Sequence, residues 1–337
     1  MSLPFVVTFG EVMLRLSTPG FARFPQSGHF NATYGGGEAN VAVSLAYFGL
    51  PAAHVTRFPD NDLGKAATQL LRQHGVDTRH IRYGGDRLGL YFLETGAASR
   101  AGRIIYDRTH SAFAQLQPEA FDWEEILEGA RWFHWTGITP AISEGAARAC
   151  REAIRVANRR GIPVSADVNY RRNLWQYGKT AAEAMPELVE GCDLIVASTN
   201  DAAEIFGIRP EPGADDAYQS VCQRLMQRFP RLKRVTTTHR GVVSSSHNTL
   251  AAVLWNGRDL VRTVEYPIVP IVDRIGGGDA FLAGLLYGLL TDQHDQQALD
   301  FAVAASVLKH AIEGDANLAT VAEVESLVKG EVGRLVR

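Results

Sequence analysis

Cysteine is scarce in this sequence, and the three that occur, Cys150, Cys192 and Cys222, lie far apart. Their odd number and wide spacing, without a Cys-x-x-Cys pair or a His-x-x-x-His pair, indicate neither a disulfide framework nor a structural zinc site. We therefore expect three free thiols.

Long hydrophobic runs are also missing. The longest, residues 280–290, includes Gly284 and Gly288 and is shorter than the roughly 20 apolar residues that a membrane helix needs. Residues 1–4 do not begin a basic stretch followed by a long apolar region, as a secretory signal would. We therefore expect a cytoplasmic protein without a membrane partner.

An excess of one charge is absent as well, because 34 Lys and Arg stand against 37 Asp and Glu, a net charge of −3. A general nucleic-acid binder should be strongly basic, so this class is not expected. Hydrophobic residues make up 46% and charged residues 21% of the 337 residues, which is ordinary globular usage. At this length we expect two domains, or one large domain with an appendage.

Short apolar runs alternate with helical patterns along most of the chain. Strands are expected at residues 4–9, 53–57, 131–136, 163–167, 193–197 and 233–237, and helices at 38–48, 145–159, 181–189 and 215–229. This alternation is typical of right-handed crossover units. It predicts a Rossmann-like, three-layer α/β fold, with a mostly parallel sheet and helices on both faces.

Two segments, residues 11–33 and 87–109, break this alternation and contain no convincing helix. Residues 90–94 and 103–108 alternate like the strands of a hairpin. We therefore expect an α/β body of residues 1–10, 34–86 and 110–337, and a small β-sheet of residues 11–33 and 87–109. Because ligands of parallel sheets bind at the carboxyl ends of the strands, that small sheet would be a lid.

The most informative motif is Asp-Arg-Ile-Gly-Gly-Gly-Asp at residues 273–279, which precedes an apolar helical pattern. The amides of Gly276, Gly277 and Gly278 could turn together toward an anion such as a phosphate. Asp279 would then lie beside a transferred phosphoryl group and accept the proton of an attacking hydroxyl. The alternative is a glycine-rich turn in which Asp279 only stabilises the start of the helix.

Two other nucleotide motifs fail on single residues. Gly178-Lys179-Thr180 resembles the end of a P-loop, but Asn173 occupies the position of the first glycine. Phe281 stands where a dinucleotide fingerprint needs Gly or Ala, which disfavours a Rossmann dehydrogenase.

Three further groups could contact a ligand. Asn40, at the end of Gly-Gly-Gly-Glu-Ala-Asn (residues 35–40), could bind sugar hydroxyls, or this segment could be only a tight turn. Arg171 follows a strand and could bind an anion, or could be a solvated loop charge. Tyr106 and Arg108 share one face of the hairpin, where Arg108 could bind a carboxylate with two hydrogen bonds, unless the hairpin is an ordinary amphipathic sheet.

With its glycine motifs at residues 35–40 and 273–281, the chain resembles the ribokinase-like (PfkB) carbohydrate kinases over nearly its whole length. Residues 10–16, 169–175 and 273–274 are most similar to kinases of 2-keto-3-deoxygluconate. The resemblance implies that Asp279 is the catalytic base and that the amides of Gly276, Gly277 and Gly278 form an anion hole. It implies substrate contacts at Gly36, Asn40, Tyr91, Tyr106, Arg108 and Arg171. It implies ATP contacts at Ser198, Thr238, Arg240, Gly276, Gly278, Lys309 and Gly314.

Two positions depart from the family pattern. Where the family has Asn-x-x-Glu supporting magnesium, this chain has Ser198-Thr199-Asn200-Asp201. Asp201 keeps a carboxylate that could support the metal indirectly, whereas Ser198 loses the amide. Glu11 replaces the Asp that contacts sugar hydroxyls in many members, and its longer side chain disfavours ribose or adenosine as substrate.

The resemblance thus implies ATP- and Mg²⁺-dependent phosphorylation of a primary hydroxyl of a keto-deoxy sugar acid, with 2-keto-3-deoxygluconate and its 6-phosphate as the leading pair. A monovalent cation is an optional addition. Fructokinase is the competing activity, and a non-catalytic sugar or nucleotide sensor on the same fold is the competing class. Lid sheets of this family often pair between subunits, so a homodimer through the lid is also expected.

Overall fold

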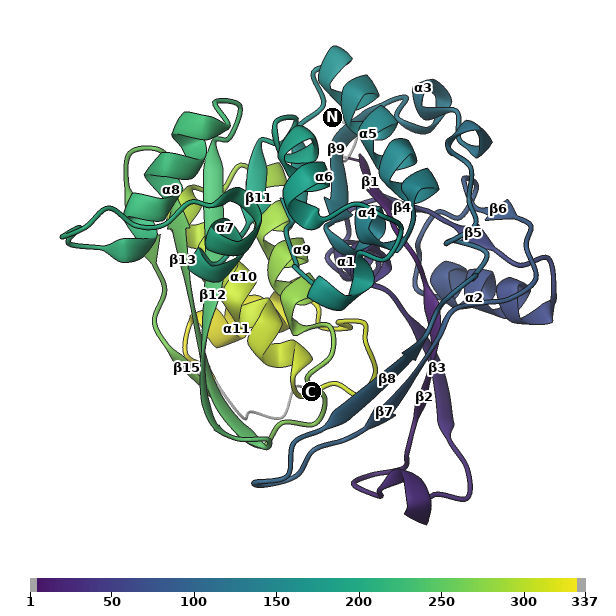
Figure 1. The fold of residues 1–337 in the computed structure, drawn as a ribbon. Coiled ribbons are helices and arrows are strands. Elements are labelled where there is room, and N and C mark those ends of the chain that lie inside the picture. Colours follow the sequence, from purple (N-terminus) through teal and green to yellow (C-terminus); the bar gives the residue numbers. More distant parts are fainter. Residues whose placement is uncertain (1–4, 332–337) are drawn as a thin grey trace.

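The computed structural model describes residues 5–331 and contains one large central sheet (Figure 1). Its strands are β1 (Phe5–Phe9), β4 (Ala52–Val55), β9 (Ala130–Thr136), β10 (Val164–Asp167), β11 (Leu194–Val196), β12 (Arg234–Ser244), β13 (His247–Trp255), β14 (Leu260–Arg262) and β15 (Tyr266–Ile268). They run in the order β14-β13-β12-β11-β10-β9-β1-β4, and β15 also pairs with β13. The strands from β4 to β12 are parallel, and β13 pairs antiparallel with β12, β14 and β15.

Helices cover both faces of this sheet. They are α1 (Gly37–Tyr47), α2 (Asp62–Gln73), α3 (Trp123–Ile126), α4 (Ile138–Ile142), α5 (Glu144–Arg159), α6 (Ala181–Val189), α7 (Thr199–Phe206), α8 (Ala217–Arg228), α9 (Gly277–Leu290), α10 (Asp295–Lys309) and α11 (Val321–Val328). Successive residues of a strand face opposite sides. Accordingly, Val7 and Phe9 belong to the hydrophobic cluster with α5, α6, α7 and α8, whereas Val6 belongs to the cluster with α1, α2, α9 and α10.

The expected fold class is therefore confirmed, and each expected strand and helix overlaps an observed one. Pro4, at the start of the first expected strand, lies outside the described residues. The largest difference is β12, which was expected to end near residue 237 and continues to Ser244 as a hairpin with β13. Within residues 5–331, no helix combines the length and apolar character needed to cross a bilayer.

A second, small sheet comes from the two segments that interrupt the alternation. Its strands are β2 (Met13–Ser17), β3 (Asn31–Gly35), β7 (Leu90–Glu94) and β8 (Arg103–Asp107), in the order β3-β2-β7-β8. The expected hairpin is present, since β7 and β8 pair antiparallel from Leu90 opposite Asp107 to Glu94 opposite Arg103. Figure 1 shows this sheet projecting from the body, with the tip of its hairpin near the β12–β13 hairpin. There, the amide of Ser245 donates to the carbonyl of Ala98 at 2.8 Å. A further two-stranded sheet joins β5 (Arg57–Phe58) and β6 (Arg82–Tyr83).

Candidate active site

A cavity of about 520 Å³ lies between the small sheet and the carboxyl ends of β10 and β11. This is the edge where ligands of parallel sheets bind. Most of the residues singled out from the sequence line this cavity, namely Gly36, Asn40, Tyr91, Tyr106, Arg108, Arg171, Ser198, Asp201, Thr238, Gly276, Gly277, Gly278 and Asp279. Arg240, Lys309 and Gly314 do not. Chain segments that are far apart in the sequence thus meet around one space.

The three consecutive glycines at the start of α9 have different neighbours. Gly276 has a left-handed φ of +83°, and a Cβ there would collide with the carbonyl oxygen of Asp315. A Cβ on Gly277 would lie 2.6 Å from Cε1 of the buried His310. A Cβ on Gly278 would meet no atom within 4 Å. Packing therefore explains the first two glycines, whereas Gly278 faces open space in the cavity.

Asp279 lies in the first turn of α9 and is half-buried. Its Oδ2 accepts a hydrogen bond of 2.7 Å from Nδ2 of the buried Asn40. Burial raises the pKa of the Asp279 carboxyl to about 7, although the hydrogen bond from Asn40 opposes the shift. A carboxylate with such a pKa is suited to accept a proton near neutral pH.

A second carboxyl, Asp167, lies at the end of β10 and lines the same cavity. Burial, and next the charge of Asp201, raise its pKa to about 7. Asp201 also accepts hydrogen bonds from the amide and hydroxyl of Ser198, at 2.9 and 2.6 Å, and so caps its own helix α7. The sequence analysis did not select Asp167 as a site residue. The available signal was its place at the carboxyl end of a buried strand.

Asp167 and Asp201 line the same cavity, and the charge of Asp201 acts on Asp167, so a divalent cation between them would relieve their repulsion. Among residues 5–331, however, no group of three or more His, Cys, Asp or Glu side chains could hold a metal ion. Mg²⁺ often takes only one or two protein carboxylates and completes its shell with water and phosphate oxygens. Asp167 and Asp201 are therefore compatible with Mg²⁺ that arrives with a nucleotide phosphate.

The model of the pfkB family carbohydrate kinases matches residues 4–319. The chain belongs to this family. A 2-dehydro-3-deoxygalactonokinase of Haloferax volcanii is 32% identical to this kinase in an alignment of 335 positions that covers 96% of this chain and 96% of that protein.

Solved structures agree with this assignment. The crystal structure of 2-dehydro-3-deoxygluconokinase from Thermotoga maritima superposes with a TM-score of 0.93 at 42% identity, and covers 98% of this chain and 99% of that one. Fructokinase with bound ATP from Xylella fastidiosa has a TM-score of 0.78 at 21% identity, over 98% and 99% of the two chains, and shares the fold.

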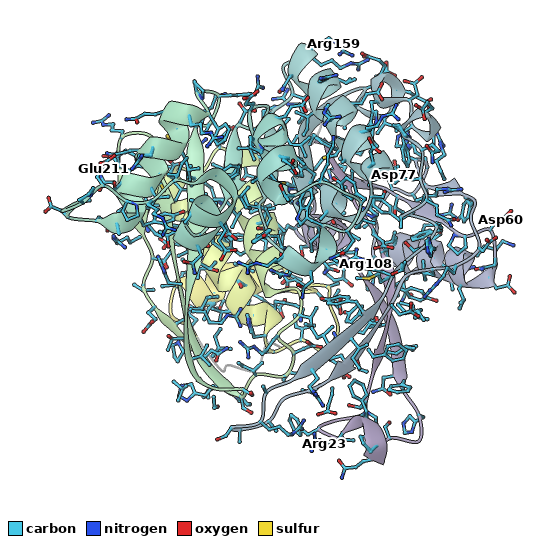
Figure 2. All side chains as sticks on the ribbon, in the orientation of Figure 1. Arg23, Asp60, Asp77, Arg108, Arg159 and Glu211 are labelled. Atoms are coloured by element: carbon cyan, nitrogen blue, oxygen red, sulfur yellow. The ribbon has the colours of Figure 1, made fainter. Side chains whose placement is uncertain are left out.

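Arg108 lies where the small sheet of the kinase meets the body (Figure 2). Its Nε donates to Oε2 of the buried Glu11 at 2.8 Å, and Nη2 donates to the same oxygen. Ser111 donates to the other oxygen of Glu11. The sequence analysis did not foresee that Arg108 would already be paired. In the described part of the chain Nη1 of this guanidinium has no acceptor, so Nη1 is available to a ligand.

The other expected substrate contacts differ in how free their polar groups are. Arg171 is exposed, and its Nη1 donates only to the neighbouring carbonyl of Tyr170 at 3.2 Å. Tyr91 is buried and donates its hydroxyl to Asp315, whereas the ring of Tyr106 is 51% exposed. The two tyrosine rings pack with their centroids 5.9 Å apart. A ligand in the cavity can therefore contact the ring of Tyr91 and the whole side chain of Tyr106.

Three of the expected ATP contacts, Arg240, Lys309 and Gly314, lie outside the cavity lining. Lys309 is fully buried, and its Nζ donates to the carbonyl of Ile312 at 2.9 Å. The amide of Gly314 donates to Asp273 at 3.1 Å. Burial, and next the like charge of Arg274, lower the pKa of Arg240. Their contact with ATP stays a prediction.

Proposed function

We propose that this kinase transfers the γ-phosphoryl group of ATP to the primary hydroxyl of 2-keto-3-deoxygluconate or a closely related keto-deoxy sugar acid. One observation carries the proposal: a single cavity holds the raised-pKa carboxyl of Asp279, the start of α9 and the guanidiniums of Arg108 and Arg171. The names of the relatives in Haloferax volcanii and Thermotoga maritima support the same substrate class.

The proposed chemistry assigns each group a place relative to the reacting oxygen. Asp279 accepts the proton of the sugar hydroxyl as that oxygen attacks the γ-phosphorus, and Asn40 keeps the carboxylate oriented. The amides at the start of α9, with the positive end of the helix dipole, stabilise the negative charge on the transferred group. When bound, Mg²⁺ neutralises phosphate charge, and Asp167 and Asp201 would hold it, partly through water.

The charge of the substrate separates the proposed activity from that of a fructokinase. A sugar acid carries a carboxylate, for which Nη1 of Arg108 and the exposed guanidinium of Arg171 are suitable partners. Fructose is uncharged and would give neither Nη1 of Arg108 nor the guanidinium of Arg171 an anionic ligand group. We therefore rank the sugar acid above fructose.

The decisive experiment measures ADP release with ATP and Mg²⁺ across 2-keto-3-deoxygluconate, 2-keto-3-deoxygalactonate, fructose, ribose and adenosine. We expect the highest kcat/KM for one of the two sugar acids, and their ratio identifies the preferred epimer. A preference for fructose would overturn the substrate assignment, and the absence of ADP release with every sugar would favour the sensor. Replacing K⁺ and Na⁺ by tetramethylammonium in the same assay tests whether a monovalent cation is required.

We also propose that two copies pair through the small sheet. Its edge strand β8 is exposed along its whole length, and Ile105 is 55% exposed on the side away from the cavity. Unpaired strand edges with apolar side chains readily bind another strand. Sedimentation should give a dimer that Ile105→Glu weakens, whereas Val264→Glu, at a position 66% exposed outside this sheet, should leave it intact. A monomer at all concentrations would contradict this proposal.

A further inference from the structure

A buried cation links the small sheet to the loops around the start of α9. Arg15, on β2, donates from Nη1 to Oδ1 of Asp315 at 2.7 Å and from Nη2 to Oδ2 of Asp273 at 2.6 Å. The exposed fraction of these side chains is 4% for Arg15, 4% for Asp315 and 5% for Asp273. Two buried carboxylates therefore depend on one guanidinium.

Both carboxylates belong to the segments that shape the anion-binding end of the cavity. Asp273 accepts hydrogen bonds from the amides of Ile275, at 3.0 Å, and Gly314, at 3.1 Å. It therefore ties the segment before α9 to the segment after α10. The backbone carbonyl of Asp315 packs against Gly276, where α9 begins. A displacement of either carboxylate would change where the amides of the glycine loop point.

The same network reaches the sugar side of the cavity. Tyr91, on β7 beside β2, donates its hydroxyl to Oδ2 of Asp315, the oxygen that Arg15 leaves free. Burial and the neighbouring Asp315 charge raise the pKa of Tyr91, which keeps the hydroxyl protonated. Tyr91 and Met13 also pack against Ile275, which lies next to Gly276. A charge network and apolar packing thus connect the small sheet to the loop.

We propose that Arg15 is a positioning residue. It couples closure of the small sheet over the sugar to the conformation of the phosphate-binding loop at the start of α9. The inference rests on the proposed kinase activity and extends it. It predicts that ATP binds more tightly when the sugar site is occupied, since the seated sheet fixes Asp273 and Asp315. If Arg15 had a purely structural role, it would stabilise the fold without coupling the binding of sugar to the binding of ATP.

The test measures the Kd of a non-hydrolysable ATP analogue by calorimetry, with and without the sugar that the parent phosphorylates. We expect sugar to tighten this Kd about fivefold or more in the parent. In Arg15→Lys and in Tyr91→Phe the ratio should fall toward one. Kinetics should show KM for ATP raised by about tenfold in Arg15→Lys, with KM for the sugar changed by less than about threefold.

The matched control is Arg100→Met. Arg100 also belongs to the hairpin of the small sheet and pairs with a buried carboxylate, Glu94, at 2.8 Å, but it does not contact the loops at Asp273 and Asp315. We expect it to lose stability and to keep the sugar effect on the analogue. This comparison separates the coupling from a general loosening of the sheet.

Three outcomes are distinguishable. If Arg15→Lys and Tyr91→Phe lose only thermal stability and keep the parent's coupling ratio, the inference is wrong. If Arg15→Lys does not fold, the isosteric Tyr91→Phe decides alone. If the parent phosphorylates no sugar, the proposed function fails, and weaker analogue binding in Arg15→Lys than in Arg100→Met would still support the positioning of the loop.

Discussion

Asp279 is the side chain on which the proposed transfer depends most directly. Replacing it with Asn keeps the size and the contact with Asn40 but removes the oxygen that accepts the hydroxyl proton. Loss of a general base lowers turnover by about 10²- to 10⁴-fold, so we expect kcat of Asp279→Asn to fall within this range. Binding of the ATP analogue serves as the control and should be retained. A kcat within a factor of about two of the parent would exclude Asp279 as the base.

Gly276 and Gly278 allow a matched comparison at neighbouring positions. Gly276→Ala forces a side chain into a left-handed conformation and against Asp315, so we expect it to lower the free energy of unfolding by about 1 to 2 kcal/mol or more. Gly278→Ala meets open space in a helix and should fold at least as stably as the parent. If a phosphate approaches the Gly278 amide, its added methyl group should lower kcat/KM for ATP about tenfold, less than loss of a whole donor costs.

Thermal melts and ATP kinetics on both variants check this expectation. The informative result is a stable Gly278→Ala protein with weak use of ATP. Parent-like ATP kinetics in Gly278→Ala would mean that no ligand approaches this amide closely.

Arg108 tests the charge of the substrate. Truncating one member of a buried charge pair costs about 2 to 5 kcal/mol, so Arg108→Ala should raise KM for the sugar acid by roughly 30-fold or more, with a much smaller change in KM for ATP. The same change deprives the buried Glu11 of its cation and should lower stability. The double variant with Glu11→Gln removes that buried charge and should regain stability while KM stays high. Turnover of fructose, if the enzyme uses it, should change little.

At the residue scale, local motifs predicted residues that line the cavity, but not the contacts that hold their side chains. The glycine loop, Asp279 and Asn40 were found because short spacings carry their chemistry. The pairing of Arg108 with Glu11 joins residues 97 positions apart, and no local pattern contains it. Asp167 was not selected because its raised pKa depends on burial and on Asp201 from another element, which no local pattern contains.

The small sheet is the element on which closure of the proposed site depends. Its strand β8 is exposed throughout and is paired on one side only, by β7, so its amides should exchange quickly without ligand. We expect hydrogen exchange in residues 87–109 to slow when sugar and a non-hydrolysable ATP analogue are both bound. Helix α5, which contributes no residue to the cavity lining, is the internal control. Unchanged exchange in residues 87–109 would argue against a lid.

Elements were predictable from the sequence where a single periodicity determines them. The parallel strands are buried apolar runs, and the β7–β8 hairpin shows the alternation of a two-faced sheet. The extension of β12 beyond Thr237 was missed because Thr238, His239 and Arg240 are polar. Those residues are strand because β13 supplies an antiparallel partner, with Thr238 opposite Ala252 and Arg240 opposite Leu250. The partner, not the local composition, determines the structure there.

At the scale of the whole molecule, the carboxyls of Asp167 and Asp279 should make stability depend on pH. Their pKa values of about 7 in the folded protein lie above the ordinary value of 3.8, so between about pH 4 and pH 7 the folded state binds more protons than the unfolded state. Stability from these groups is therefore present at low pH and is lost as pH rises through 7. Asp167→Asn and Asp279→Asn each remove one of these carboxyls and so avoid its loss of stability. The Tm of each variant minus that of the parent should therefore increase from pH 5 to pH 8.

Other buried groups also titrate, but their contribution to stability cancels when each Asn variant is compared with the parent. Burial lowers the pKa of His54 and His134 to about 3, so these imidazoles cost stability as pH falls below about 6.5. They are present in the parent and in each Asn variant and cancel in the difference. An equal Tm difference at pH 5 and pH 8 would show that neither carboxyl is shifted.

The pairing of Arg15 with Asp315 spans 300 positions of the chain, and this separation has a consequence for biosynthesis. Domains fold as they emerge from the ribosome, at about 5 to 20 residues per second. The strand that carries Arg15 is therefore made roughly 15 to 60 seconds before the residue that anchors it. During that interval the small sheet lacks its contact with Asp315, and the exposed apolar side chain of Ile105 on β8 is accessible to other nascent chains. Synthesis of the segment around Asp315 thus determines when the strand that carries Arg15 can take its final place in the enzyme.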